Sequence, residues 1–88
     1  MKAAERTYIG RVKLLPCSCC GADGPSIAHH IRDGQGMAQR AAHWLTIALC
    51  ESCHIDPLLG IHGERRMMKI MKVNELDLLA KTIERLNP

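Results

Sequence analysis

The chain of 88 residues is poor in aromatic side chains, with no Phe, one Trp and one Tyr. Its core must therefore be built from Leu, Ile, Val, Ala and Met, which bury less area per residue than aromatic side chains do. A chain of this length buries only about 60% of the surface that its unfolded form exposes, which leaves its stability marginal. The sequence thus predicts a single domain, 1–88, that is stabilised by a bound metal or by disulfides.

The chain also has no apolar run that approaches the length of roughly 20 residues that a membrane-spanning helix needs. The first residues, M-K-A-A-E-R, do not resemble a secretory signal, in which an apolar stretch follows a charged one. We therefore expect a cytoplasmic protein with no membrane partner, in which clustered cysteines bind metal more often than they form disulfides. The formal charge of +3 favours a polyanionic partner only mildly.

Apolar periodicity and turn residues divide the chain into short segments that are typical of an α+β fold. Two segments rich in β-branched residues, 26–32 and 43–49, predict strands, and the long Gly-containing loop between them is of a kind that often carries substrate contacts. Helical patterns cover the segments 3–15, 64–71 and 74–86, and a short helical turn covers residues 50–55.

The helix expected at 74–86 carries the clearest signals. Asn74 is a favourable N-cap, Asp77 partly completes a capping box, and Val73 with Leu78 forms a hydrophobic staple. An apolar stripe along this helix is expected to face the core. The members of the stripe are Leu76, Leu79, Ala80, Ile83 and Leu86.

Four of the five cysteines form two C-x-x-C pairs, Cys17 with Cys20 and Cys50 with Cys53. Each pair offers two thiolates at the separation that one tetrahedral Zn²⁺ requires, so the two pairs together predict a structural four-sulfur zinc site. Cys19 is an alternative ligand to either member of the first pair, although the spacing favours Cys17 with Cys20. Such a site would supply the missing stability, because metal binding can contribute folding free energy.

The run L-C-E-S-C-H at 49–54 is open to other interpretations. C-x-x-C-H is the attachment signature of a c-type haem, and C-x-x-C also occurs as a redox dithiol. A haem needs export to an oxidising compartment and a second axial ligand, and both the absent signal and the second cysteine pair argue against it. Buried free thiols are the simplest alternative to a metal site.

Five histidines are many for a chain of this length, although each one taken singly would more often be an ordinary core or surface residue. His29 and His30 are neighbours on the first expected strand, where adjacent side chains point to opposite faces. We therefore expect one to bind metal and the other to transfer protons, because neutral imidazole does either near pH 7. The remaining three are His43, His54 and His62.

Taken together, these motifs resemble the HNH endonucleases, and most closely the phage-associated, RecA-dependent branch. The resemblance rests on C-S-C-C-G, A-H-H-I, L-C-E-S-C-H and G-I-H-G, and it covers about residues 16–63. It implies a small ββα-metal core that is buttressed by zinc and flanked by N- and C-terminal helices. It also implies a metal-dependent DNA endonuclease that nicks or cuts by phosphodiester hydrolysis in phage or prophage recombination, with a recombinase filament as a partner.

By this resemblance the expected catalytic residues are His30 as general base and, as ligands of a divalent ion, His29 and His54, with His62 as a further ligand. Mg²⁺, Mn²⁺, Ni²⁺ and Zn²⁺ are the candidate ions, and imidazole ligands suit transition metals better than Ca²⁺. The middle Asn of the HNH motif is absent, and His43 stands in its region. The His43 ring or a backbone carbonyl is then expected to orient the base.

Four arginines are expected to contact the DNA backbone: Arg32, Arg40, Arg65 and Arg66. Contacts to phosphate carry no base information, so binding without sequence preference is the natural expectation. The alternative function is a non-catalytic zinc-knuckle module that binds nucleic acid or protein. The two functions differ over His30, which a nuclease needs and a binding module does not.

Overall fold

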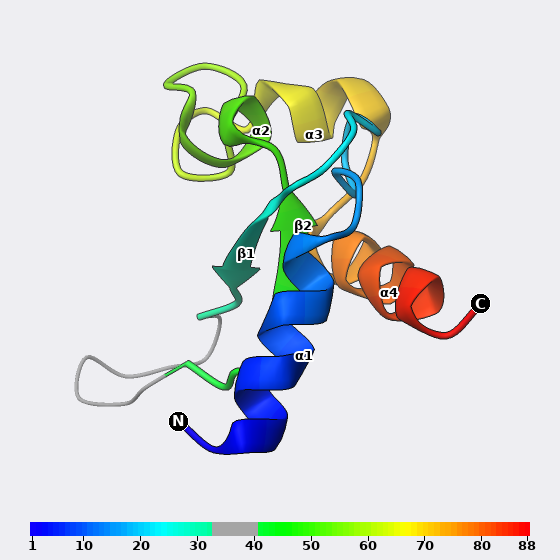
Figure 1. Cartoon of the computed structure of the whole chain (residues 1–88). Helices are drawn as coiled ribbons and strands as arrows, with labels where there is room; N and C mark the ends of the chain where they lie inside the picture. Colours follow the sequence, from blue (N-terminus) through cyan, green and yellow to red (C-terminus); the bar gives the residue numbers. More distant parts are fainter. Residues whose placement is uncertain (33–40) are drawn as a thin grey trace.

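The computed structural model describes residues 1–32 and 41–88, which form a two-stranded sheet and four helices (Figure 1). In chain order the elements are α1 (Ala3–Lys13), β1 (Ile27–His30), β2 (Thr46–Leu49), α2 (Glu51–Ile55), α3 (Arg66–Met71) and α4 (Glu75–Leu86). The predicted α+β class is therefore confirmed, with elements slightly shorter than the predicted segments. Among the described residues, no helix has the length and apolar character needed to cross a membrane.

The two strands pair antiparallel, with His29 opposite Ile47 and His30 opposite Thr46. Because residues that lie opposite each other point to the same face of a sheet, His29 shares its face with Ile47. His30 shares the other face with Thr46 and Ala48. All four residues of β2 are buried, which explains why this strand is continuously apolar apart from one threonine.

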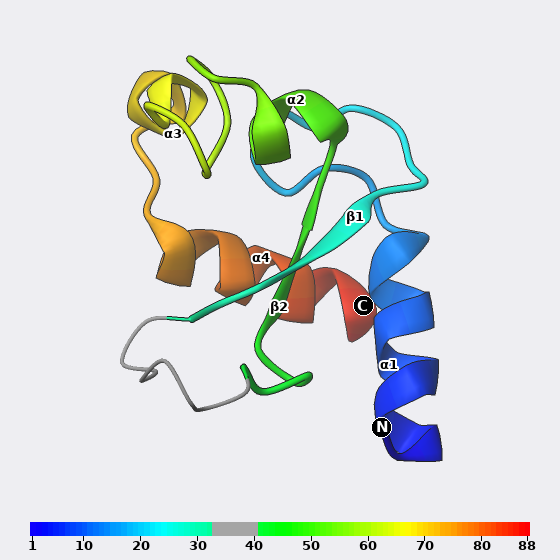
Figure 2. The same cartoon turned by 90° about the vertical axis from the view of Figure 1, so that its left-hand side faces the viewer.

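The two faces of β2 contribute to two apolar clusters. Ala48 packs with Val12 of α1 and with Leu86 at the end of α4. Ile47 and Leu49 belong to the larger cluster, which also contains residues of the cysteine loop, α2 and α3. Figures 1 and 2 show α1 and α4 alongside the strands, and α2 with α3 beyond the C-terminal end of β2.

The N-terminus of α4 has the predicted capping arrangement. The Asn74 side chain accepts a hydrogen bond from the Asp77 N–H, and the Asp77 carboxylate accepts one from the Asn74 N–H, both at 2.9 Å. The expected staple residues, Val73 and Leu78, pack in the same apolar cluster. The start of this helix is therefore determined locally, as the sequence indicates.

The predicted core-facing stripe of α4 is partly wrong. Leu86 is buried and Leu79 is half-buried, but the other three members are exposed, namely Leu76 (68%), Ile83 (42%) and Ala80. The helix instead buries the face that runs through Leu78, Thr82 and Leu86. A polar residue thus lies at the middle of the buried face, and counting apolar residues alone places that face incorrectly.

Thr82 is buried because its hydroxyl group links three parts of the fold. It donates a hydrogen bond to the Leu78 carbonyl oxygen at 2.9 Å and accepts one from the Ala48 N–H at 3.3 Å. Its oxygen also lies 2.7 Å from the hydroxyl of Ser18, which donates to it. This single hydroxyl group therefore ties α4 to β2 and to the cysteine loop.

Replacing Thr82 with Val should lower the free energy of unfolding by about 1–3 kcal/mol, because the methyl group leaves the Ala48 N–H and the Ser18 hydroxyl without their buried partner. Urea denaturation of zinc-loaded protein, followed by circular dichroism, measures the change. Thr82→Ser is the matched control, since it keeps the hydroxyl group. A Thr82→Val protein as stable as the wild type would show that these hydrogen bonds do not stabilise the fold.

Candidate metal centres and the adjoining cleft

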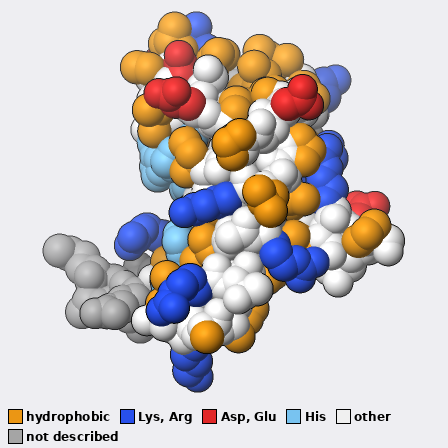
Figure 3. All heavy atoms as spheres, in the orientation of Figure 1, with side chains coloured by type: hydrophobic (Ala, Val, Ile, Leu, Met, Phe, Trp, Pro, Cys, Tyr) orange, Lys and Arg blue, Asp and Glu red, His pale blue; other side chains and the backbone are white. Residues whose placement is uncertain are grey.

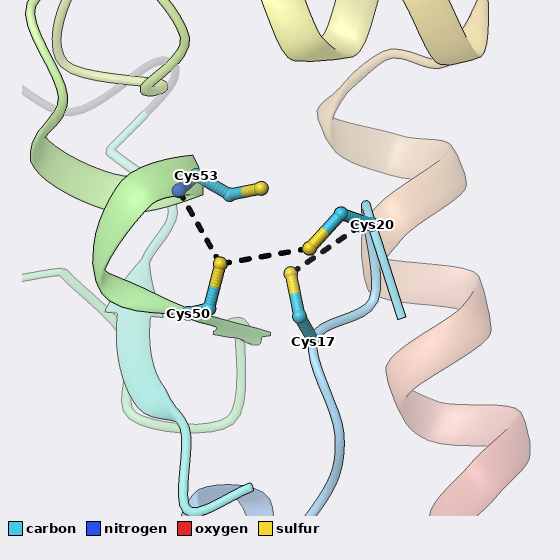
Figure 4. A group of neighbouring side chains, drawn as sticks. All are labelled: Cys17, Cys20, Cys50 and Cys53. Carbon is cyan, nitrogen blue, oxygen red and sulfur yellow. Dashed lines mark hydrogen bonds between the residues drawn. The ribbon is translucent and has the colours of Figure 1, made fainter. Parts of the chain in front are cut away.

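Four cysteine side chains converge between the loop that precedes β1 and the N-terminus of α2 (Figure 4). The sulfur atoms of Cys17, Cys20, Cys50 and Cys53 all lie within 4.8 Å of one another, and those of Cys20 and Cys50 are 3.6 Å apart. A tetrahedral zinc with bonds of about 2.3 Å would separate its sulfurs by roughly 3.8 Å. The four thiols therefore have the spacing of a closed zinc site.

Both halves of this cluster are built by the same local geometry. The Cys20 N–H donates to the Cys17 sulfur, and the Cys53 N–H donates to the Cys50 sulfur, each at 3.5 Å. Cys50 is the N-cap of α2, so amides at the start of this helix point toward its sulfur. Gly21 ends the first hook with a φ of 79°, a left-handed conformation that glycine adopts without strain.

The sulfurs are too close to one another to ionise together without a cation. Burial raises the pKa of Cys17, but backbone N–H groups of Cys20, Cys50 and Cys19 outweigh that effect and bring the pKa to about 7. Burial raises the pKa of Cys53, and the neighbouring thiols raise it further; burial also raises that of Cys20. The Cys17 thiolate forms readily, whereas ionisation of Cys20 and Cys53 needs positive charge nearby, which is the condition that a zinc ion satisfies.

Cys19 lies next to these four residues but outside the set. Its side chain is 3% exposed and packs in the larger apolar cluster. Burial raises its pKa, and the charge of Cys17 raises it further, so Cys19 stays a neutral thiol. The structure therefore brings together the four cysteines expected from the spacing and places the fifth in the core.

A second group consists of three imidazole rings, those of His29, His54 and His62, which can offer ring nitrogens within 4.8 Å of one another. The Nε2 atoms of His54 and His62 face each other at 3.1 Å. His54 Nδ1 is buried and has no hydrogen-bond partner among the described residues. Three rings that offer nitrogens this close to one another fit a shared metal ion, and imidazole donors favour Zn²⁺ or Ni²⁺ over Mg²⁺.

His62 reaches His54 because the segment after α2 folds back onto that helix. The Ile61 N–H donates to the Cys53 carbonyl oxygen at 2.8 Å, and the His62 N–H donates to the His54 carbonyl oxygen at 3.2 Å. His29 approaches the same point from β1, with its ring centroid 4.9 Å from that of His62. The three ligand candidates therefore come from a strand, a helix and a loop.

Two glycines make this return possible. A Cβ atom at Gly60 would lie 2.7 Å from the backbone nitrogen of Asp56, and one at Gly63 would collide with the carbonyl group of Pro57. A side chain at either position would push the loop away from Asp56 and Pro57, the residues at which the loop begins. Both glycines of the G-I-H-G motif are therefore needed for the loop to hold His62 against α2.

His30 lies on the opposite face of the hairpin from His29, as the alternation of strand side chains predicts. Its Nε2 atom is 3.1 Å from Nδ1 of His43. Trp44, which follows His43, packs against Tyr8 of α1 with ring centroids 5.0 Å apart. This contact holds the segment that carries His43 in place. Burial lowers the pKa of His30, with further contributions from His43 and Arg32, which favours the neutral ring at pH 7.

A cleft of about 540 Å³ opens beside both histidine groups. The residues of its wall that matter here are His29, His30, His62, Arg32, Arg65 and Glu75. Burial lowers the pKa of His29 to about 4, with further contributions from His62, His54 and Arg65. Figure 3 shows histidine side chains reaching the surface next to Lys and Arg side chains. The basic residues of the cleft wall are Arg32 and Arg65.

The four arginines expected at the DNA backbone have different positions. Arg32 and Arg65 line the cleft. Arg66 does not line the cleft, and its Nε atom instead pairs with the Glu64 carboxylate at 2.7 Å. Arg40 lies outside the described residues.

Glu75 is a cleft residue that sequence reasoning missed. It lies in the first turn of α4, and its carboxylate accepts a hydrogen bond from Arg65 at 3.1 Å. Residues 65 and 75 belong to different elements, so no helical or strand spacing signals their contact. Only the turn between α3 and α4 brings them together.

Comparison of the chain with protein-family models, with curated proteins and with solved structures finds no match. Its function must therefore be inferred from the chemistry of the two centres and the cleft.

Purified protein should hold about one tightly bound zinc per chain at the four-sulfur site, since all four thiols have the required spacing. Cys20→Ser should lose most of this zinc under mild chelation, whereas Cys19→Ala should retain it. Elemental analysis before and after chelation measures both. Zinc loss from the Cys19 variant, or full retention by the Cys20 variant, would contradict the ligand set.

Gly63→Ala should weaken binding of a second ion by at least about tenfold without removing the zinc, because the loop can no longer hold His62 against His54. Titration calorimetry of zinc-loaded protein with Ni²⁺ measures the affinity. Gly10→Ala is the matched control, since a Cβ atom at Gly10 on α1 meets nothing within 4 Å. Unchanged Ni²⁺ affinity in the Gly63 variant would rule out this role for the loop.

Proposed function

We propose that the chain is a metal-dependent DNA endonuclease with an HNH-type ββα-metal core, which nicks or cuts DNA by phosphodiester hydrolysis. The observation that carries the proposal is the arrangement of two histidine groups around one cleft. A three-imidazole cluster adjoins it through His29 and His62, and a paired imidazole adjoins it through His30. A metal site and a neutral base that face the same space are the components that hydrolysis of a phosphodiester requires.

The residues that would hold the ion are His29, His54 and His62. A bound divalent ion supplies stabilisation of the negative charge that develops on the phosphate and the leaving oxygen. Three protein ligands leave coordination positions open, in contrast to the closed four-sulfur site. The two centres therefore divide into one that stabilises the fold and one that is accessible from the cleft.

His30 acts as the general base, and His43 positions it. The hydrogen bond between His30 Nε2 and His43 Nδ1 contains a single hydrogen, and the tautomers decide which atom carries it. When the hydrogen is on His30 Nε2, the Nδ1 atom of the same ring has a free lone pair and can take a proton from water. When His43 donates instead, His30 Nδ1 carries a proton and cannot act as a base. His43 as acceptor thus selects the productive tautomer.

Positive charge in the cleft favours binding of the DNA backbone. Arg32 and Arg65 both line the cleft, and the chain has a formal charge of +3. Electrostatic contacts of this kind act on phosphate whatever the base sequence. We therefore propose DNA without a strong sequence preference as the substrate.

Zinc-loaded wild-type protein should nick supercoiled plasmid when Ni²⁺, Mn²⁺ or Mg²⁺ is added, and His30→Ala should lower the rate by about 10²–10⁴-fold, because the variant lacks the base. Agarose-gel quantification of nicked and linear plasmid measures the rate. Zinc content and thermal unfolding must match between the two proteins.

Two variants of His43 test whether this residue orients His30. In His43→Asn the amide oxygen can occupy the place of the ring Nδ1 and accept the same hydrogen bond, so this protein should nick faster than His43→Ala. Equal cleavage by wild type and His30→Ala would defeat the catalytic assignment. The non-catalytic zinc-knuckle module, which binds nucleic acid or protein, would then be the better description.

A further inference from the structure

Two consecutive arginines at the start of α3 have different environments. Arg65 lines the cleft together with His29 and His62. Arg66 is ion-paired with Glu64 and does not line it. The two side chains have the same charge and are adjacent in sequence, so any difference in their function must come from how the backbone directs them.

Arg65 has a left-handed backbone, with φ of 57° and ψ of 32°. This conformation is unfavourable for a residue with a Cβ atom and persists only where the surrounding contacts impose it. Here the guanidinium group is fixed at two points. Its Nε–H donates to the Ile61 carbonyl oxygen at 2.9 Å, and its Nη2 donates to the Glu75 carboxylate at 3.1 Å.

These two bonds leave one edge of the guanidinium group free. Arginine has five N–H donors, and within the described part of the chain no hydrogen bond uses Nη1 of Arg65. The Arg65 side chain is 49% exposed, whereas that of Glu75 is 21% exposed. The Ile61 carbonyl and Glu75 thus hold the Nε and Nη2 atoms of the guanidinium group. The Nη1 donors remain free, and Arg65 lines the same cleft as His29 and His62.

We propose that Arg65 is the residue that binds the phosphate to be cleaved, and that Glu75 is a positioning residue that holds Arg65 ready for it; the inference rests on the proposed nuclease function. A guanidinium group that is already oriented needs no rearrangement as negative charge increases on the phosphate. Its planar donors also match two phosphate oxygens, which an ammonium group does not.

The arginines can be compared directly. Arg65→Ala should lower kcat for plasmid nicking by about 10²–10³-fold, and Arg66→Ala should change it by less than about threefold. Arg65→Lys keeps the positive charge but loses the planar, paired donors of the guanidinium group, so this variant should still be about tenfold slower than the wild type. Equal effects of the Arg65 and Arg66 substitutions would overturn the assignment.

Glu75 is tested by a conservative pair. Glu75→Gln retains an oxygen that accepts the Arg65 hydrogen bond, so its kcat should stay within about threefold of the wild type. Glu75→Ala removes the acceptor and should lower kcat by about tenfold with little change in KM, because the charge of Arg65 is still present. Glu75→Ala with wild-type kcat, or Glu75→Gln as impaired as Glu75→Ala, would exclude positioning through this hydrogen bond.

DNA binding gives a readout that does not depend on turnover. In a His30→Ala background, the affinity for a fluorescent duplex is measured by anisotropy over a range of salt concentrations. Arg65→Ala should reduce the slope of log affinity against log salt by about 0.9, the value for one phosphate contact, and Arg66→Ala should leave it unchanged. If the wild type nicks plasmid but the Arg65 substitution changes neither slope nor kcat, this inference alone fails. If the wild type does not nick with any of the ions, the proposed function fails.

Discussion

The convergence of four thiols on one point is the constraint on which the other parts of this structure depend. Cys17 and Cys53 are themselves members of the larger apolar cluster, whereas Cys20 is exposed, so the candidate zinc site lies at the edge of the core. A chain without phenylalanine has few ways to complete such a core, and a metal bound there contributes folding free energy directly. The loop before β1 and the start of α2 are far apart in sequence, and a zinc ion bound by these four thiols would hold them together.

The second organising feature is the two-residue period of a β-strand. Two adjacent histidines on β1 point to opposite faces, so His29 joins His54 and His62 while His30 meets His43. One short hairpin thereby supplies both a candidate metal ligand and a candidate base. Because both side chains also border the cleft, their separation into two environments does not separate them from a common substrate. Different partners then give the two rings different proposed tasks.

Much of the fold could be predicted from the sequence because its signals are local. The C-x-x-C spacings, the Asn74 and Asp77 cap and the β-branched segments each depend on residues within one turn or one strand. The sequence misplaces the buried face of α4 because, besides the Leu78 carbonyl oxygen within the helix, the Thr82 hydroxyl has partners in Ser18 and Ala48, which are distant in sequence. A polar residue looks exposed until its partners are known.

The site was predictable in composition but not in arrangement. Spacing placed the four zinc-ligand candidates, and the histidines were recognisable as a set. The pairing of His30 with His43 is one of the two alternatives that the family resemblance left open, and the structure shows the ring nitrogen as the partner. The difference between Arg65 and Arg66 depends on a backbone turn that leaves no periodic signal. Glu75 was missed for the same reason, since its role appears only when α3 and α4 are placed together.

The short helix α2 begins just after one zinc-ligand candidate, Cys50, and contains a second, Cys53, which immediately precedes the histidine-site candidate His54. The loop bearing His62 is hydrogen-bonded to the carbonyl groups of Cys53 and His54. Filling the sulfur site would therefore order the histidine site and lower the entropic cost of its own ion. By thermodynamic linkage each ion would raise the affinity for the other by the same factor. A chain that has not yet acquired zinc would then be a poor host for an ion at the three histidines, so that the histidine site would fill only after folding is complete.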